Sequence, residues 1–135
     1  MKSISSVVRL GLVPGSVYVI PGLPKSSYEI AIYVIKNTFG ITENEMVENT
    51  RKEEIRFARQ VCMVLLNCSG LSLAKSGLPF NRDHATVLHS RKVISNIIEV
   101  KYPKQDYDNI IRAISQYRNE LPNINLSHLP GDWSN

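Results

Sequence analysis

The sequence has only two cysteines and no long hydrophobic run, and each shortage excludes a class of protein. Cys62 and Cys68 are six residues apart, which matches neither a CxxC motif nor the usual spacing of zinc ligands. We therefore expect two reduced thiols, buried or half-buried. No segment approaches the roughly 18 apolar residues that a membrane span needs. Arg9 and two Pro-Gly pairs interrupt the apolar N-terminal stretch, so it has no continuous apolar region of the kind found in signal peptides, and we expect a cytoplasmic protein.

Clusters of residues that carry chemistry are also scarce. No nucleophile lies at a usable spacing from a base, and no carboxylate pair or metal cluster can be recognised. His84 and His89 are five residues apart, which puts them on different faces of a helix and makes them a poor metal pair. We therefore expect no enzymatic activity, no cofactor and no metal.

Length and charge fit one soluble domain. The 135 residues include 16 Lys and Arg against 12 Asp and Glu, which gives a net charge of +4. A chain of this length buries roughly two-thirds of its unfolded surface, so it needs no disulfide or metal to fold. The positive charge is compatible with a nucleic-acid partner but does not require one.

The two ends of the chain differ from its centre. Residues 1–24 are rich in Val, Pro and Gly, and we interpret them as an apolar arm that is irregular or forms short strands at 7–12 and 16–20. An isolated hairpin is marginal in water, so this arm is expected to pack on the body, to meet a protein partner or a second copy, or to be partly disordered. Residues 122–135 form a tail, in which Trp133 is either a loose aromatic side chain or an anchor.

Residues 25–121 show the pattern of about six helices. Ser26 and Thr42 are each followed three residues later by Glu, the spacing of a capping box. Helical apolar periodicity indicates a helix after each cap, a long one from Glu53 or Glu54 to Ser69, and a short one over 72–77. Two more are expected, one ending near residue 101 and one over 106–120. We therefore predict an all-α domain.

The stretch 81–92 has the features of a DNA recognition helix. Asn81 is expected to cap the free N–H groups, with Asp83 in the first turn. Apolar residues at helical spacing follow, so the body of the helix can pack on a core. A short helix, a tight turn and a helix with a polar tip form a helix-turn-helix, whose tip reaches base edges. The polar groups at this tip belong to Arg82, Asp83, His84 and Thr86.

Three runs of this sequence resemble one family. The run 82–89 reads RDHATVLH, and it is preceded by Arg59-Gln60 and by Leu71-Ser72-Leu73. These runs resemble the C-terminal DNA-binding domain, called domain IV, of the bacterial replication initiator DnaA, whose signature is close to RDHTTVLH. The resemblance covers roughly residues 27–120. It implies a Trp-repressor-like helix-turn-helix bundle that binds double-stranded DNA with a preference for sequence.

The resemblance also assigns DNA contacts to individual residues. Base edges in the major groove would be read by Asp83, His84 and Ala85. Phosphates would be held by Arg82, Thr86 and His89. The neighbouring minor groove would receive Arg51, and the backbone beside it would be contacted by Lys52, Arg59 and Gln60.

The sequence departs from the family pattern at several positions. The usual Thr is Ala85 here, which keeps a methyl group for a thymine but lacks the hydroxyl. Glu53 and Glu54 replace basic or small residues and weaken the local positive field, and a family Pro is Ala58. Two glycines before the signature become Asn81, the non-Gly residue that best tolerates a left-handed turn.

The ATPase portion of the family has no counterpart in this sequence. The nearest run to G-x-x-x-x-G-K-[ST] is residues 22–26, GLPKS, with Pro in place of the second glycine. We therefore expect no nucleotide binding. The resemblance implies a free-standing relative of the DNA-binding module, with a role related to replication initiation or its regulation.

Simpler interpretations remain open for these residues. Arg82 and Asp83 can cap a helix and form a surface ion pair, Thr86 can be an ordinary first-turn residue, and His89 a half-buried one. Solvated surface charges are the alternative for Arg51, Lys52 and Arg59. The domain can also be a protein-interaction module that keeps the fold without binding DNA. We interpret four tyrosines as edges of the core rather than as platforms for base stacking: Tyr28, Tyr33, Tyr107 and Tyr117.

Overall fold

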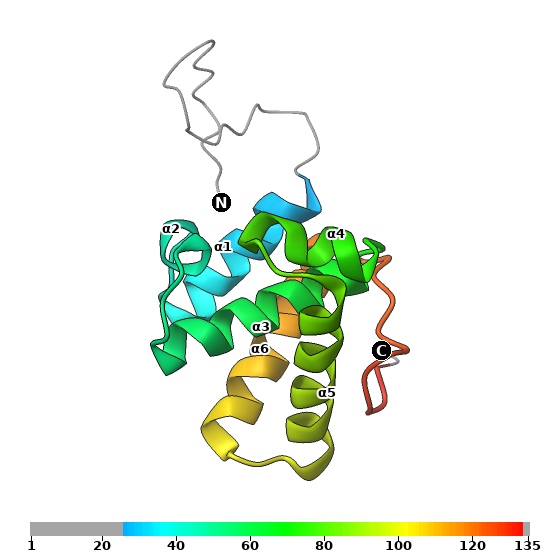
Figure 1. Cartoon of the computed structure of the whole chain (residues 1–135). Helices are drawn as coiled ribbons and strands as arrows, with labels where there is room; N and C mark the ends of the chain where they lie inside the picture. Colours follow the sequence, from blue (N-terminus) through cyan, green and yellow to red (C-terminus); the bar gives the residue numbers. More distant parts are fainter. Residues whose placement is uncertain (1–25, 134–135) are drawn as a thin grey trace, which may run out of the picture.

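One central helix, α3 (Glu53–Cys68), organises the molecule (Figure 1). The computed structural model describes residues 26–133, and in this part α3 packs against α1, α2, α4, α5 and α6. Ten of its sixteen residues are buried, including every residue from Val61 to Leu66. A helical stretch that is apolar on all sides, as residues 61–66 are, is stable only when other elements cover it. The fold is therefore a helical bundle built around α3.

The surrounding helices follow in chain order. They are α1 (Ser27–Phe39), α2 (Glu43–Val47), α4 (Leu73–Gly77), the short 3₁₀ helix η1 (Leu78–Phe80), α5 (His84–Val100) and α6 (Lys104–Glu120). Described residues contain no strand, which confirms the prediction of an all-α helix-turn-helix bundle of about six helices. The predicted strands at 7–12 and 16–20 lie outside the described residues.

Local capping explains where the first two helices begin. The hydroxyl of Ser26 accepts a hydrogen bond from the Glu29 N–H at 3.1 Å, and the Glu29 carboxylate accepts one from the Ser26 N–H at 2.9 Å. Thr42 and Glu45 repeat this arrangement at α2. Each pair satisfies two N–H groups that have no partner inside the helix. Both predicted capping boxes are therefore confirmed, and Gly40 ends α1 in a left-handed conformation.

The segment after α6 packs back on the bundle without forming a helix. Leu126 and Leu129 are buried in the core, and the Asn125 N–H donates to the Cys68 carbonyl at 2.8 Å. Trp133 is half-buried, and its indole N–H faces the Leu129 carbonyl at 3.4 Å. Of the two interpretations of this tryptophan, the anchor is the one that the structure supports.

The tyrosines divide into three environments. Tyr117 is fully buried, Tyr28 and Tyr107 are half-buried against the core, and Tyr33 is 45% exposed. The prediction that all four are core edges is therefore wrong for Tyr33, which is not among the buried residues of α1. Both cysteines are buried and unpaired, as predicted. No described helix is long and apolar enough to cross a bilayer.

Candidate nucleic-acid interface

The turn between α4 and α5 depends on two residues with special backbone requirements. Gly77 lies so close to this turn that a Cβ added there would be 2.4 Å from the Arg82 carbonyl oxygen. Asn81 has φ 56° and ψ 45°, a left-handed conformation that Asn adopts more readily than most residues. The Arg82 N–H donates to the Gly77 carbonyl at 3.0 Å. Together these features make the close approach of a helix-turn-helix, as predicted, with Asn81 at the bend.

Asp83, rather than Asn81, caps α5. One Asp83 carboxylate oxygen accepts hydrogen bonds from the backbone N–H and the hydroxyl of Thr86, each at 2.9 Å. The prediction that Asn81 caps the helix and Asp83 lies in its first turn is therefore wrong by two residues. Asn81 has the left-handed backbone of the bend, and a cap needs extended backbone, which Asp83 has. Hydrogen bonds from the Thr86 backbone and then its hydroxyl hold the pKa of Asp83 below its usual value.

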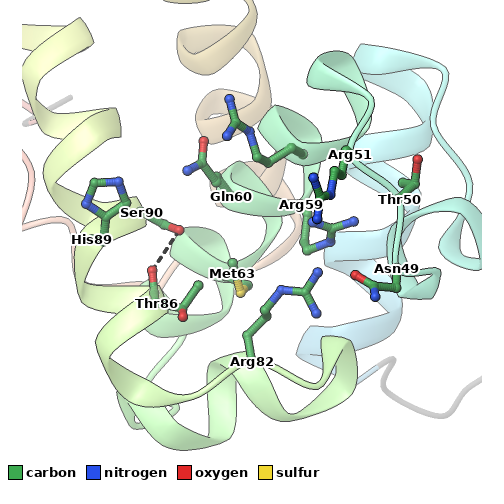
Figure 2. A pocket seen from close by; sticks show the side chains of 11 residues that line it. Asn49, Thr50, Arg51, Arg59, Gln60, Met63, Arg82, Thr86, His89 and Ser90 are labelled. Atoms are coloured by element: carbon green, nitrogen blue, oxygen red, sulfur yellow. Dashed lines mark hydrogen bonds between the residues drawn. The ribbon is translucent and has the colours of Figure 1, made fainter.

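A pocket of about 440 Å³ lies between the tip of α5 and the basic loop, defined as residues 48–52, which connects α2 to α3. Figure 2 shows α5 side chains on one side of this pocket and basic-loop side chains on the other. Its lining contains four arginines and no carboxylate. Such a concentration of one charge attracts anions. The lining residues are Asn49, Thr50, Arg51, Arg56, Arg59, Gln60, Met63, Arg82, Thr86, His89 and Ser90.

Six of the ten predicted contact residues lie in this lining. They are Arg51, Arg59, Gln60, Arg82, Thr86 and His89. The other four, which are exposed and not among the lining residues, are Lys52, Asp83, His84 and Ala85. The helix tip and the basic loop, separated by about thirty positions of sequence, are thus on the same side of the molecule.

Arg82 is held at the edge of the pocket by its own turn. Its guanidinium donates to the Phe80 carbonyl at 2.7 Å and lies 3.4 Å from the Asn81 carbonyl oxygen. Phe80 is fully buried, so this bond ties a half-exposed cation to the core. Among residues 26–133 no ion pair joins Arg82 to Asp83, which removes the surface ion pair as an explanation of these two residues.

Arg59 is buried at the inner wall of the pocket. The side chain is only 3% exposed, and its Nε–H donates to the Met46 carbonyl at 2.8 Å while an Nη donates to the Glu48 carbonyl at 3.2 Å. Burial, and then the charges of Arg82 and Arg56, lower the pKa of Arg59. The interpretation of Arg59 as a solvated surface charge does not fit a guanidinium held by two carbonyls, whereas its predicted contact with the DNA backbone stays a prediction.

The pocket also contains an arginine that we did not predict. Arg56 lines it and forms an ion pair with Glu53 one turn earlier. A signal exists in the sequence, because Arg56, Gln60 and Met63 are spaced three and four residues apart and so share one face of a helix. Glu53 and Glu54 are exposed but do not line the pocket. In the described part of the chain, no group of three or more acidic, His or Cys side chains could hold a metal ion.

Comparison with known proteins agrees with this geometry. Residues 29–94 match the family model described as the bacterial dnaA protein helix-turn-helix. This range runs from α1 through the turn into the middle of α5, so it contains the capping box of α2, the basic loop and the tip of α5. No solved structure matches significantly.

Several relatives are each named chromosomal replication initiator protein DnaA. The protein from Crocosphaera subtropica is 34% identical over 105 residues, which cover 76% of this chain and 21% of the relative. That from Streptococcus agalactiae is 38% identical over 95 residues, covering 69% and 19%, and that from Oenococcus oeni is 32% identical over 85 residues, covering 61% and 19%. The chain thus spans about a fifth of the length of these relatives. By its fold, its turn and this match, the chain belongs to the bacterial DnaA helix-turn-helix family.

Proposed function

We propose that residues 25–121 bind double-stranded DNA with a preference for sequence, in a process related to replication initiation. The tip of α5 enters the major groove, and the basic loop contacts the adjacent minor groove and backbone. The observation that supports this most is the carboxylate-free pocket lined by four arginines between those two elements. Family membership supports DNA as the anion that this surface meets.

In this proposal, phosphate contacts supply most of the affinity. Arg82, Thr86 and His89 bind phosphates along one strand, and Lys52 and Gln60 bind the backbone beside the basic loop. Arg51 enters the minor groove, whose negative potential attracts guanidinium groups. Such contacts position the protein but carry no sequence information themselves.

Base preference in this proposal comes from three exposed residues at the start of α5. Asp83 uses one carboxylate oxygen as the helix cap, which leaves the other to accept a hydrogen bond from a base amino group. His84 and Ala85 follow on the exposed first turn, where His84 hydrogen-bonds a base edge and the Ala85 methyl touches a thymine methyl. The position of Ala85 is then read by apolar contact alone.

A mobility-shift titration of the full chain against labelled duplexes tests the proposal, after selection of preferred duplexes from a random pool. Arg82→Ala should weaken binding to every duplex, whereas His84→Ala should cost about 1–3 kcal/mol on the selected site and relax preference at one base pair. Lys104→Ala is a matched control, because this cation is 85% exposed on α6 and does not line the pocket.

The selected site also tests the base readers one at a time. Ala85→Thr adds a hydroxyl at the exposed tip and should shift preference at a single base pair while leaving the dependence on salt unchanged. Absence of duplex binding by the wild-type chain at low salt would refute the proposal. Light scattering that then showed a stable dimer or hetero-complex would favour a protein-interaction module instead.

A further inference from the structure

We propose that Arg59 is a positioning residue that holds the basic loop in place for Arg51, and is not itself a ligand of DNA. This inference rests on the proposed DNA-binding function and assigns different roles to two arginines of the pocket, with Arg59 positioning the loop and Arg51 contacting DNA. It concerns how the loop acquires its shape before any duplex arrives.

The first argument is where the guanidinium donates. Met46 lies in the last turn of α2 and Glu48 directly follows that helix, so their carbonyls belong to the helix end that lacks internal partners. Arg59 satisfies both from α3, with bonds of 2.8 and 3.2 Å. A cation is also favoured at a helix C-terminus. One side chain thus joins the end of α2 to the middle of the core.

The second argument is what else holds the basic loop. Asn49, Arg51 and Lys52 are exposed and add nothing to the core. Backbone bonds hold the two ends of the loop, where the Arg56 N–H donates to the Lys52 carbonyl at 2.9 Å and the Glu48 N–H to the Asn44 carbonyl at 3.2 Å. Within the loop, the Lys52 N–H lies 3.3 Å from the Thr50 hydroxyl oxygen. To these contacts at its ends Arg59 adds a bond from a buried side chain of α3 to the Glu48 carbonyl, and this bond ties the loop to the core.

The third argument is burial. With 3% of its surface exposed, Arg59 cannot bring its Nε or its bonded Nη to a phosphate without giving up a carbonyl, and charge-assisted bonds of this kind are costly to break. Arg51, in contrast, is exposed on the same pocket. Figure 2 shows the two side chains beside each other, Arg59 extending from α3 and Arg51 from the loop. In this proposal the exposed Arg51 binds DNA, and the buried Arg59 fixes the position of the loop that carries Arg51.

Arg59→Lys separates the two roles, because Lys keeps the charge but cannot donate to two carbonyls as a planar fork. If Arg59 positions the loop, the variant should lose duplex affinity by about tenfold or more and should release about one counterion fewer on binding, as Arg51→Ala does. In the Arg59→Lys background, Arg51→Ala should then have little further effect.

The matched control is Arg118→Lys, since Arg118 also donates from its guanidinium to a backbone carbonyl, that of Trp133 in the C-terminal segment. This control should leave duplex affinity and the salt dependence unchanged. Wild-type affinity for Arg59→Lys, or effects of the Arg51 and Arg59 variants that simply add, would overturn the proposal and make Arg59 a direct or dispensable contact.

Two measurements keep this inference separate from DNA binding. In the free protein, Arg59→Lys should speed amide hydrogen exchange at Glu48 and Lys52, and unchanged exchange would overturn it even if the wild type binds no duplex. In the wild type, the Arg59 Nε–H signal should exchange slowly and stay in place when duplex is added. A large displacement of that signal by DNA would also overturn the inference, with no variant needed.

Discussion

Replacing Gly77 by Ala tests how tightly α4 and the turn before α5 approach each other. The added methyl carbon would lie 2.4 Å from the Arg82 carbonyl oxygen, about 1 Å short of the 3.4 Å at which ordinary contacts begin, and 2.9 Å from a methyl group of Val87. The Arg82 carbonyl oxygen belongs to the backbone, so it cannot move aside by rotation of a side chain. Either α4 or the turn must therefore move.

The size of the effect is a balance of two terms. Forcing a methyl group into a packed site costs about 1–3 kcal/mol, and a backbone obstacle favours the upper end. Ala is intrinsically better than Gly in a helix by about 1 kcal/mol, which offsets part of this cost. We expect a net loss of about 2 kcal/mol in the free energy of unfolding, which corresponds to a fall in Tm of roughly 10 °C for a domain of this size.

Urea and thermal denaturation of Gly77→Ala measure this loss, and Ala74→Gly is the control for helix propensity, because Ala74 is exposed on the same short helix. Because the strain falls on the residue that precedes Asp83, duplex affinity should fall as well when measured at a temperature where both proteins are folded. A Gly77→Ala protein as stable as the wild type would refute the reasoning, since it would mean that the turn has room for a side chain.

Three further outcomes follow from individual groups. Hydrogen bonds from the Thr86 backbone and then its hydroxyl lower the pKa of Asp83 below its ordinary 3.8, so its carboxylate stabilises the fold above that pH. When the pH falls from about 5 to about 2, the free energy of unfolding should therefore decrease more for the wild type than for Asp83→Asn. Arg51→Ala should weaken binding to all duplexes and reduce the slope of log affinity against log salt by about one, as a salt titration would show. Burial raises the pKa of Cys68 to about 11 and raises that of Cys62 too, so a thiol reagent should label neither in the folded protein and both in denaturant.

The helices and the turn were largely predictable because their signals are local. Ser26 and Thr42 begin helices through contacts three residues away, and Asn81 could be recognised as the residue for a left-handed bend. The N-cap of α5 was assigned two residues too early, because Asn81 and Asp83 are both good caps and only the backbone of the bend distinguishes them. Local hydrogen bonds thus determine element boundaries to within a turn.

By itself, the sequence determined an all-α helix-turn-helix domain of the DnaA type and the residues at its tip, since periodicity, caps and the RDHATVLH run are properties of neighbouring positions. Only the tertiary structure decided that Arg59 turns inward to two carbonyls while Arg56 joins the pocket. Both side chains are arginines three residues apart on α3. Their different surroundings come from α2 and the basic loop packing across the helix, and no pattern along a single helix contains that contact.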